Sequence, residues 1–263
     1  MGDDFTYIAG GTDVMVNRQQ ENETASCLVD ISGIEELQQV TVEGQTLKIG
    51  ALVKLDQLKH YPEIQENFPV LIEAAEAVGS PLIRKTGTIG GNLLCENRCV
   101  YYNHSAFWRE AVNYCLKSGG DICIASGGPK ACFSEFVSDT APALICLDAQ
   151  VEIVDTTGTE LKPLESIYTG DGLKPRNLPK TALLAFIHLS LNASYQAVFK
   201  KLRPRSGVDF TSLTTAVSLN GENRLKIAVG GVSPGPVVVE APADTDREQL
   251  IRQVLKGCKT VDN

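Results

Sequence analysis

The 263-residue chain has no apolar run approaching the ~18 residues that a membrane-spanning helix requires. It also has no long basic run, and acidic residues outnumber basic ones by 32 to 24, for a net charge of -8. We therefore expect neither a nucleic acid nor a membrane as the main partner. The N-terminus lacks the basic and apolar segments of a signal peptide, so we expect a cytoplasmic protein whose cysteines stay reduced.

Histidine is scarce as well, with 3 residues in the whole chain. No Ser/His/Asp or Cys/His set that could form a nucleophilic site stands out in the sequence. We therefore expect no substrate-binding acid or base, and no catalytic residue, in this chain.

Strand-like and helix-like segments are mixed along the chain, which indicates an α+β fold. Strand-like runs include Cys27–Asp30 and a hairpin over residues 39–49. Residues 34–40 and 54–79 have helical periodicity, with breaks near Pro62 and Pro69. A Pro- and Gly-rich linker at Thr169–Lys180 predicts a domain boundary near residue 172. Strands and short helices are expected after it, followed by a C-terminal helix.

Two glycine-rich loops could approach a phosphate-rich cofactor closely. They are AGGTDV, Ala9–Val14, and GTIGGN, Gly87–Asn92. Paired glycines allow positive φ angles and leave backbone N–H groups accessible to an anion. Neither loop matches the dinucleotide or P-loop fingerprints, so each taken alone predicts only a turn.

Five of the eight cysteines lie between residues 95 and 133. Four of them, Cys99, Cys115, Cys123 and Cys132, have the spacing C-x15-C-x7-C-x8-C. This spacing matches neither the tight pairs of zinc fingers nor the C-x2-C-x2-C run of bacterial ferredoxins. Interleaved glycines indicate a loop that folds around a bound group. This favours metal ligation over buried thiols or disulfides. Spacing alone leaves zinc and iron–sulfur open.

Three segments together resemble a known family: YIAGGTDVMV, IRKTGTIGGNL and SDTAPALICLDAQVEI. They are similar, in this order, to the FAD-binding subunit of the molybdenum hydroxylases, the xanthine dehydrogenase family. The resemblance implies a two-part FAD-binding domain of the molybdopterin dehydrogenase type over residues 1–172. A smaller α/β C-terminal domain would follow over residues 173–263. Family members usually have an additional strand and helix before the first glycine loop, so we expect a short first subdomain.

The resemblance also implies a set of FAD contacts. Backbone amides of the first loop would wrap the pyrophosphate: Ala9, Gly10, Gly11, Thr12 and Asp13. The second loop would lie over the flavin and its ribityl chain: Gly87, Thr88, Gly90, Gly91 and Asn92. Further contacts would come from Ser138, Asp139, Asp148, Leu184 and Lys201. The Lys201 cation would stabilise the reduced flavin; an ordinary charge in a solvated run is an equal alternative.

The cysteine-rich segment resembles an insert of one family branch, the beta subunit of 4-hydroxybenzoyl-CoA reductase. This resemblance implies a loop at about residues 95–136, called here the cysteine insert. It would hold a [4Fe-4S] cluster on Cys99, Cys115, Cys123 and Cys132, with Cys95 as a buried spare thiol. Nearby aromatic residues could shield the cluster or simply pack, and His104 is expected to pack.

The resemblance implies an oxidoreductase subunit that transfers electrons. A ferredoxin-like carrier would exchange electrons with the [4Fe-4S] cluster and FAD. A molybdopterin-binding large subunit and a [2Fe-2S] small subunit would complete the path, for reductive dehydroxylation of 4-hydroxybenzoyl-CoA. One alternative is the flavin subunit of a xanthine, aldehyde or N-heterocycle dehydrogenase. A second is a zinc-stabilised, flavin-free interaction module.

Overall fold

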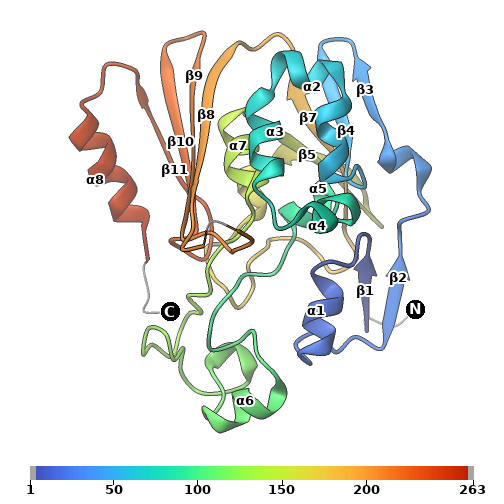
Figure 1. The fold of residues 1–263 in the computed structure, drawn as a ribbon, viewed down its shortest axis with the longest axis vertical. Coiled ribbons are helices and arrows are strands. Elements are labelled where there is room, and N and C mark those ends of the chain that lie inside the picture. The colour runs from blue at the N-terminus through green and yellow to red at the C-terminus, as the bar shows by residue number, and fades with distance from the viewer. Residues whose placement is uncertain (1–3, 206, 260–263) are drawn as a thin grey trace.

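The strands form three sheets in the computed structural model, which describes residues 4–205 and 207–259 (Figure 1). A parallel pair joins β1 (Phe5–Ile8) and β2 (Cys27–Asp30). The five-stranded sheet has the order β3 (Val40–Glu43), β4 (Thr46–Gly50), β7 (Leu183–Ser190), β5 (Gln150–Asp155) and β6 (Gly158–Pro163). The four-stranded antiparallel sheet has the order β11 (Val237–Pro242), β10 (Arg224–Gly230), β9 (Leu213–Asn220) and β8 (Tyr195–Leu202). This mixture of helices and sheets confirms the expected α+β class.

The helices are mostly short. They are α1 (Val14–Gln19), α2 (Pro62–Asn67), α3 (Pro69–Glu76), α4 (Pro81–Thr86), α5 (Ile89–Leu93), α6 (Ala106–Ala111), α7 (Thr140–Cys146) and α8 (Arg247–Gly257). Short 3-10 turns occupy Glu35–Gln38, Leu55–His60, Leu116–Ser118 and Leu164–Ile167. The breaks predicted at Pro62 and Pro69 are confirmed, because each proline occupies the first turn of its helix, where its missing N–H costs nothing. The helix predicted over residues 34–40 is only a 3-10 turn.

The main core lies between the two larger sheets, where α7 and α3 separate them (Figure 1). Every residue of α7 is buried, and this helix contacts β9 and β10 as well as α3. The continuous core runs from Leu47 and Ile187 in one sheet to Ala216 and Ala228 in the other. Burial on this scale fixes the position of the residues at both ends of α7.

Residues after the predicted linker do not all lie in the four-stranded sheet. Strand β7 begins at Leu183, yet it pairs between β4 and β5 of the five-stranded sheet. The division at residue 172 stays a prediction, and one sheet takes strands from both sides of it. Strands and short helices are expected between the linker and the C-terminal helix, but the segments that give β7 to β10 are all strands. The expected C-terminal helix is confirmed as α8.

The cysteine insert extends away from both large sheets and has one short helix, α6 (Figure 1). Its two ends come together through a β-bridge between Arg98 and Glu135. Across all the residues that the structure describes, no helix has the length and apolar character needed to cross a membrane.

Candidate flavin cavity and cysteine cluster

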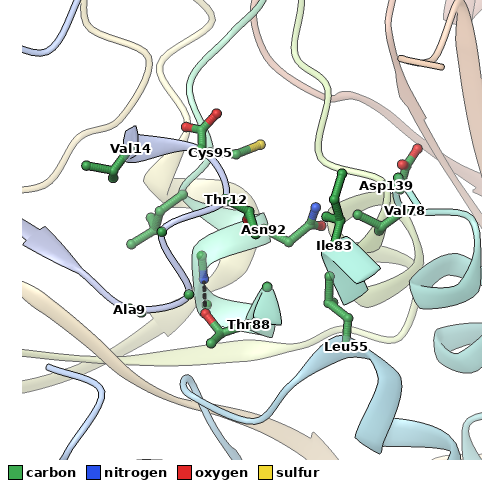
Figure 2. A pocket seen from close by; sticks show the side chains of 18 of the residues that line it. Ala9, Thr12, Val14, Leu55, Val78, Ile83, Thr88, Asn92, Cys95 and Asp139 are labelled. Carbon is green, nitrogen blue, oxygen red and sulfur yellow. Dashed lines mark hydrogen bonds between the residues drawn. The ribbon is translucent and has the colours of Figure 1, made fainter. Parts of the chain in front are cut away.

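A cavity of about 370 Å³ lies where the two glycine loops meet the start of α7 and the end of β8 (Figure 2). Small-molecule sites usually measure roughly 300–1,000 Å³, so this volume suits a cofactor-sized ligand. Most of the residues predicted to contact FAD line it: Ala9, Gly10, Gly11, Thr12, Asp13, Gly87, Thr88, Gly90, Gly91, Asn92, Asp139, Leu184 and Lys201. Ser138 and Asp148 are the two exceptions.

Close packing of backbone on backbone explains why the loops need glycine. A Cβ atom on Gly10 would lie 2.1 Å from the Thr86 carbonyl oxygen. One on Gly90 would lie 2.6 Å from the Ala51 Cβ. Gly11 has a φ of +71°, which a side chain would strain. The two loops can therefore approach each other and the core only without side chains at these positions.

The first glycine loop offers hydrogen-bond donors to the cavity. Among the described residues, no acceptor is found for the backbone amides of Gly10, Gly11 and Thr12. Once a ligand excludes water from the cavity, these amides need an acceptor, so they fit a bound phosphate. In the second loop, by contrast, the amides of Gly90 and Gly91 already donate to Ala51 O and to the Thr88 hydroxyl, the latter contact being visible in Figure 2. The donor chemistry of the first loop therefore fits FAD pyrophosphate.

Ser138 lies behind Asn92. The Ser138 hydroxyl and the Thr140 hydroxyl donate to the Asn92 side-chain oxygen, at 3.0 and 2.6 Å, and the Thr140 amide adds a third bond. These bonds satisfy the oxygen and fix the side chain, whose NH2 group remains to donate. Ser138 therefore positions a cavity residue.

Asp148 is not brought to the cavity. It follows α7, whereas Asp139 precedes that helix. A seven-residue helix is about 10 Å long, so the two carboxylates lie at opposite ends of it. Asp148 accepts a hydrogen bond of 2.9 Å from the Tyr195 hydroxyl and pairs with Lys226. The structure gives no support to its predicted FAD contact.

Lys201 and Asp139 form a buried ion pair in the cavity wall. The Lys201 Nζ lies 2.7 Å from Asp139 Oδ2, and their side chains are 6% and 5% exposed. Lys201 also donates to Ala77 O, and the Thr214 hydroxyl donates to the other Asp139 oxygen. Burial raises the pKa of Asp139, and the adjacent Lys201 cation opposes this shift. The alternative of a solvated Lys201 is wrong; its contact with the flavin stays a prediction.

Arg98 is a cavity residue that the sequence analysis did not select. It pairs with the Asp13 carboxylate, and its guanidinium lies 5.1 Å from the centre of the Phe210 ring. Asp13 also accepts a hydrogen bond of 2.9 Å from the Glu96 amide. The Asp13 side chain thus ties the first glycine loop to the start of the cysteine insert. The sequence gives no indication that Arg98 belongs to this site, because its partner Asp13 lies 85 residues away.

The cysteine insert has almost no apolar core of its own. Between Arg98 and Phe133, a range described in full, only five residues are buried as a whole: Cys99, Arg109, Cys115, Cys123 and Cys132. The Arg109 guanidinium donates to Gln20 O, Glu21 O and His104 O, which attaches the insert to the end of α1. The four thiols predicted as ligands are therefore the buried centre of this segment.

Hydrogen bonds converge on these sulfur atoms. The Tyr101 amide donates to Cys99, and the Ser134 amide donates to Cys132, whose thiol in turn donates to the Ser134 hydroxyl at 3.4 Å. The Cys115 sulfur accepts from the Ser118 hydroxyl at 3.3 Å. Donors aimed at sulfur stabilise a thiolate, which is the form that binds metals.

The pKa values reflect burial of the thiols as well as these hydrogen bonds. Burial raises the pKa of Cys99 to about 11, and the three other cysteines add to the shift through their charges, so the four thiols lie within electrostatic reach of one another. Burial also raises the pKa of Cys123, but the Ser126 side chain and the amides of Phe133, Ser126 and Ala125 outweigh it, and the net pKa is lowered.

The spacing of the thiols bears on the kind of metal site. In the part of the chain that the structure describes, no three His, Cys, Asp or Glu side chains are grouped to hold one metal ion. Zinc would need its four ligands on a single centre. A [4Fe-4S] cluster places its thiolates on separate iron atoms, so four sulfurs need only surround a common centre. The donor set fits the cluster in its chemistry.

The other residues singled out near the insert have ordinary roles. Cys95 lines the flavin cavity, and burial raises its pKa to about 12. His104 stacks on Trp108 at 4.2 Å, which confirms its packing role. Phe107 is 80% exposed, so it shields nothing within this chain. Outside the insert, Cys27 is exposed and Cys146 is buried in the core.

Comparison with known proteins gives concordant matches. Residues 1–189 match the family model described as FAD binding domain in molybdopterin dehydrogenase. The chain is 28% identical over 255 residues to the FAD-binding subunit of an aldehyde oxidoreductase from Escherichia coli (strain K12), covering 92% of this chain and 79% of that protein. It is 31% identical over 170 residues to the nicotinate dehydrogenase FAD-subunit of Eubacterium barkeri, covering 65% of this chain and 45% of that protein. A solved carbon monoxide dehydrogenase structure from Hydrogenophaga pseudoflava aligns over 100% of this chain and 82% of its own, with a TM-score of 0.73 at 19% identity.

Proposed function

Because the chain belongs to the family of FAD-binding domains in molybdopterin dehydrogenases, we propose that it carries electrons between FAD and a [4Fe-4S] cluster within a molybdenum-dependent complex. The family match covers residues 1–189 and supports FAD as the cofactor of the glycine-loop cavity. Bound FAD would supply a group that accepts and donates electrons singly or in pairs.

This chain's residues would bind and orient FAD. The amides of Gly10, Gly11 and Thr12 would donate to the pyrophosphate, and the Asn92 amide group, held by Ser138 and Thr140, would donate into the cavity. The buried Lys201 cation would lie where negative charge accumulates on reduction.

The cluster proposal rests on one observation: the four predicted ligand cysteines and Arg109 are the only residues between Arg98 and Phe133 that are buried as a whole. A segment with so little apolar core gains its order from a bound metal group when the donors are thiolates. The hydrogen bonds to these sulfurs support the thiolate form.

The partners we propose are a molybdopterin-binding large subunit and a [2Fe-2S] small subunit, with a ferredoxin-like carrier outside the complex. The resemblance of the cysteine insert favours reductive dehydroxylation of 4-hydroxybenzoyl-CoA on the large subunit. A second candidate is aldehyde oxidation, because the aldehyde oxidoreductase subunit aligns with 92% of this chain.

Anaerobic purification followed by iron, sulfide, zinc and FAD analysis tests the cofactor proposal. We expect flavin absorbance bands with a broad iron–sulfur shoulder and about four irons per chain. The Cys115→Ser variant should lose iron and keep FAD, whereas Cys146→Ser, a buried cysteine outside the insert, should keep both. A colourless protein with bound zinc would overturn the proposal.

The substrate is tested on the assembled complex. Two results together would support reductive dehydroxylation. The complex should oxidise reduced viologen when 4-hydroxybenzoyl-CoA is present, and it should not oxidise aldehydes when a dye is the electron acceptor. The opposite pattern would assign the complex to aldehyde oxidation.

A further inference from the structure

Lys117 is a buried cation inside the cysteine insert. It lies two residues after Cys115 in a short 3-10 turn, and its side chain is 8% exposed. Lys130, the next lysine of the insert, is exposed. Lysine is almost never buried unless it is paired, so specific partners must stabilise the Lys117 ammonium group.

The ammonium group is held on two sides. It pairs with Glu96 Oε1, and it lies 4.9 Å from the centre of the Tyr102 ring. The other Glu96 oxygen lies 3.0 Å from Arg176, which donates to Cys95 O at 2.9 Å. Lys117 is thus fixed by a carboxylate that is itself anchored at the flavin side of the insert.

Lys117 belongs to the turn that directly follows the predicted ligand Cys115, and the Ser118 hydroxyl of the same turn donates to the Cys115 sulfur at 3.3 Å. Burial raises the pKa of the Cys132 thiol, and the positive charge of Lys117 acts in the opposite direction on that same group. A fixed charge that acts electrostatically on one ligand sulfur also acts on a metal group bound to that sulfur. In a poorly solvated interior such an interaction is much stronger than at the surface.

We propose that Lys117 sets the reduction potential of the group held by the four cysteines, and that Glu96 positions it. This inference rests on the proposed [4Fe-4S] cluster. Bound on these cysteines, such a cluster would supply a one-electron centre between a low-potential one-electron carrier, which would be oxidised, and FAD, which would be reduced. The added electron makes the site more negative, so a nearby cation stabilises the reduced form and raises the potential. Lys117 is a positioning and tuning residue that contributes no ligand.

The test is a redox titration of the anaerobically purified, cluster-containing chain, followed by electron paramagnetic resonance. At the midpoint potential of the unaltered protein, Lys117→Met should lower the ratio of reduced to oxidised cluster about tenfold, by the Coulomb estimate for a partly screened pair. Lys117→Arg should restore the ratio, and Lys130→Met should leave it unchanged because that side chain is exposed.

Glu96→Gln provides the opposite change. It removes the counter-charge but keeps a side-chain oxygen that can accept a hydrogen bond from the Lys117 ammonium, so Lys117 stays held and the reduced fraction should rise. Opposite shifts in the two variants support the proposal, including when Lys117→Met binds less iron than the unaltered protein. Iron bound in both variants with an unchanged reduced fraction would overturn the role of Lys117 and leave the cluster proposal intact. Absence of iron from the unaltered protein would overturn the cluster proposal itself.

Discussion

The flavin cavity and the cysteine insert are built on different physical principles. The cavity is walled by loops that pack against a continuous hydrophobic core, with contacts such as Gly90 on Ala51. The insert has four thiols and one arginine as its buried residues between Arg98 and Phe133. The cavity is therefore shaped by the packed chain itself, whereas the order of the insert depends on what its thiols bind. The following predictions test this difference, from the largest effect to the smallest.

Removal of the metal group should affect the insert far more than the cavity. Metal ligation can contribute about 10 kcal/mol or more to a small domain, which is more than the few buried groups of the insert supply. After oxidation and chelation, limited proteolysis should cut between residues 100 and 131 while FAD stays bound. Simultaneous loss of FAD would show that the two regions are one structural unit.

Removing one partner of the buried ion pair in the cavity wall should lower the free energy of unfolding strongly. Lys201→Met leaves the Asp139 carboxylate buried and unpaired, which costs about 3–5 kcal/mol. Urea unfolding should show this loss, and the double variant Lys201→Met with Asp139→Asn should recover part of it. Lys200→Met, on the same strand and exposed, is the control. Equal stability of both single lysine variants would contradict the burial argument.

Gly10→Ala should disturb the cavity through a single methyl group. The new Cβ would meet Thr86 O, and relief of such a clash costs about 1–3 kcal/mol and displaces the first loop. We expect FAD to dissociate more readily by about tenfold in a fluorescence titration. Gly33→Ala is the matched control, because its Cβ would meet nothing within 4 Å. Equal affinity in both variants would argue against close packing as the reason for this glycine.

Ser138→Ala should have a small effect on FAD binding. It removes one of the hydrogen bonds that hold the Asn92 oxygen, worth about 1 kcal/mol, while Thr140 still holds the side chain. Isothermal titration should show a few-fold weaker affinity for FAD.

Asp148→Asn should leave FAD affinity unchanged, because Asp148 lies at the opposite end of α7 from the cavity. The same titration measures it, with Asp139→Asn in the cavity wall as the comparison. A weakened affinity in Asp148→Asn would restore the FAD contact that the sequence predicted.

The sequence by itself located the two glycine loops, the helix starts at Pro62 and Pro69 and the four clustered cysteines. These features depend on local sterics and on chain neighbours: a glycine tolerates close backbone approach, and a proline fits a first helical turn wherever it occurs. The cysteine spacing likewise marked a segment that is poor in apolar residues.

The tertiary structure decided the rest. It placed β7 in the five-stranded sheet, moved Ser138 behind Asn92, and put Asp148 at the far end of α7. It also buried Lys201 against Asp139, 62 residues away, and Lys117 against Glu96. Whether a charge is buried or solvated depends on which distant segments pack around it, and no local pattern records that.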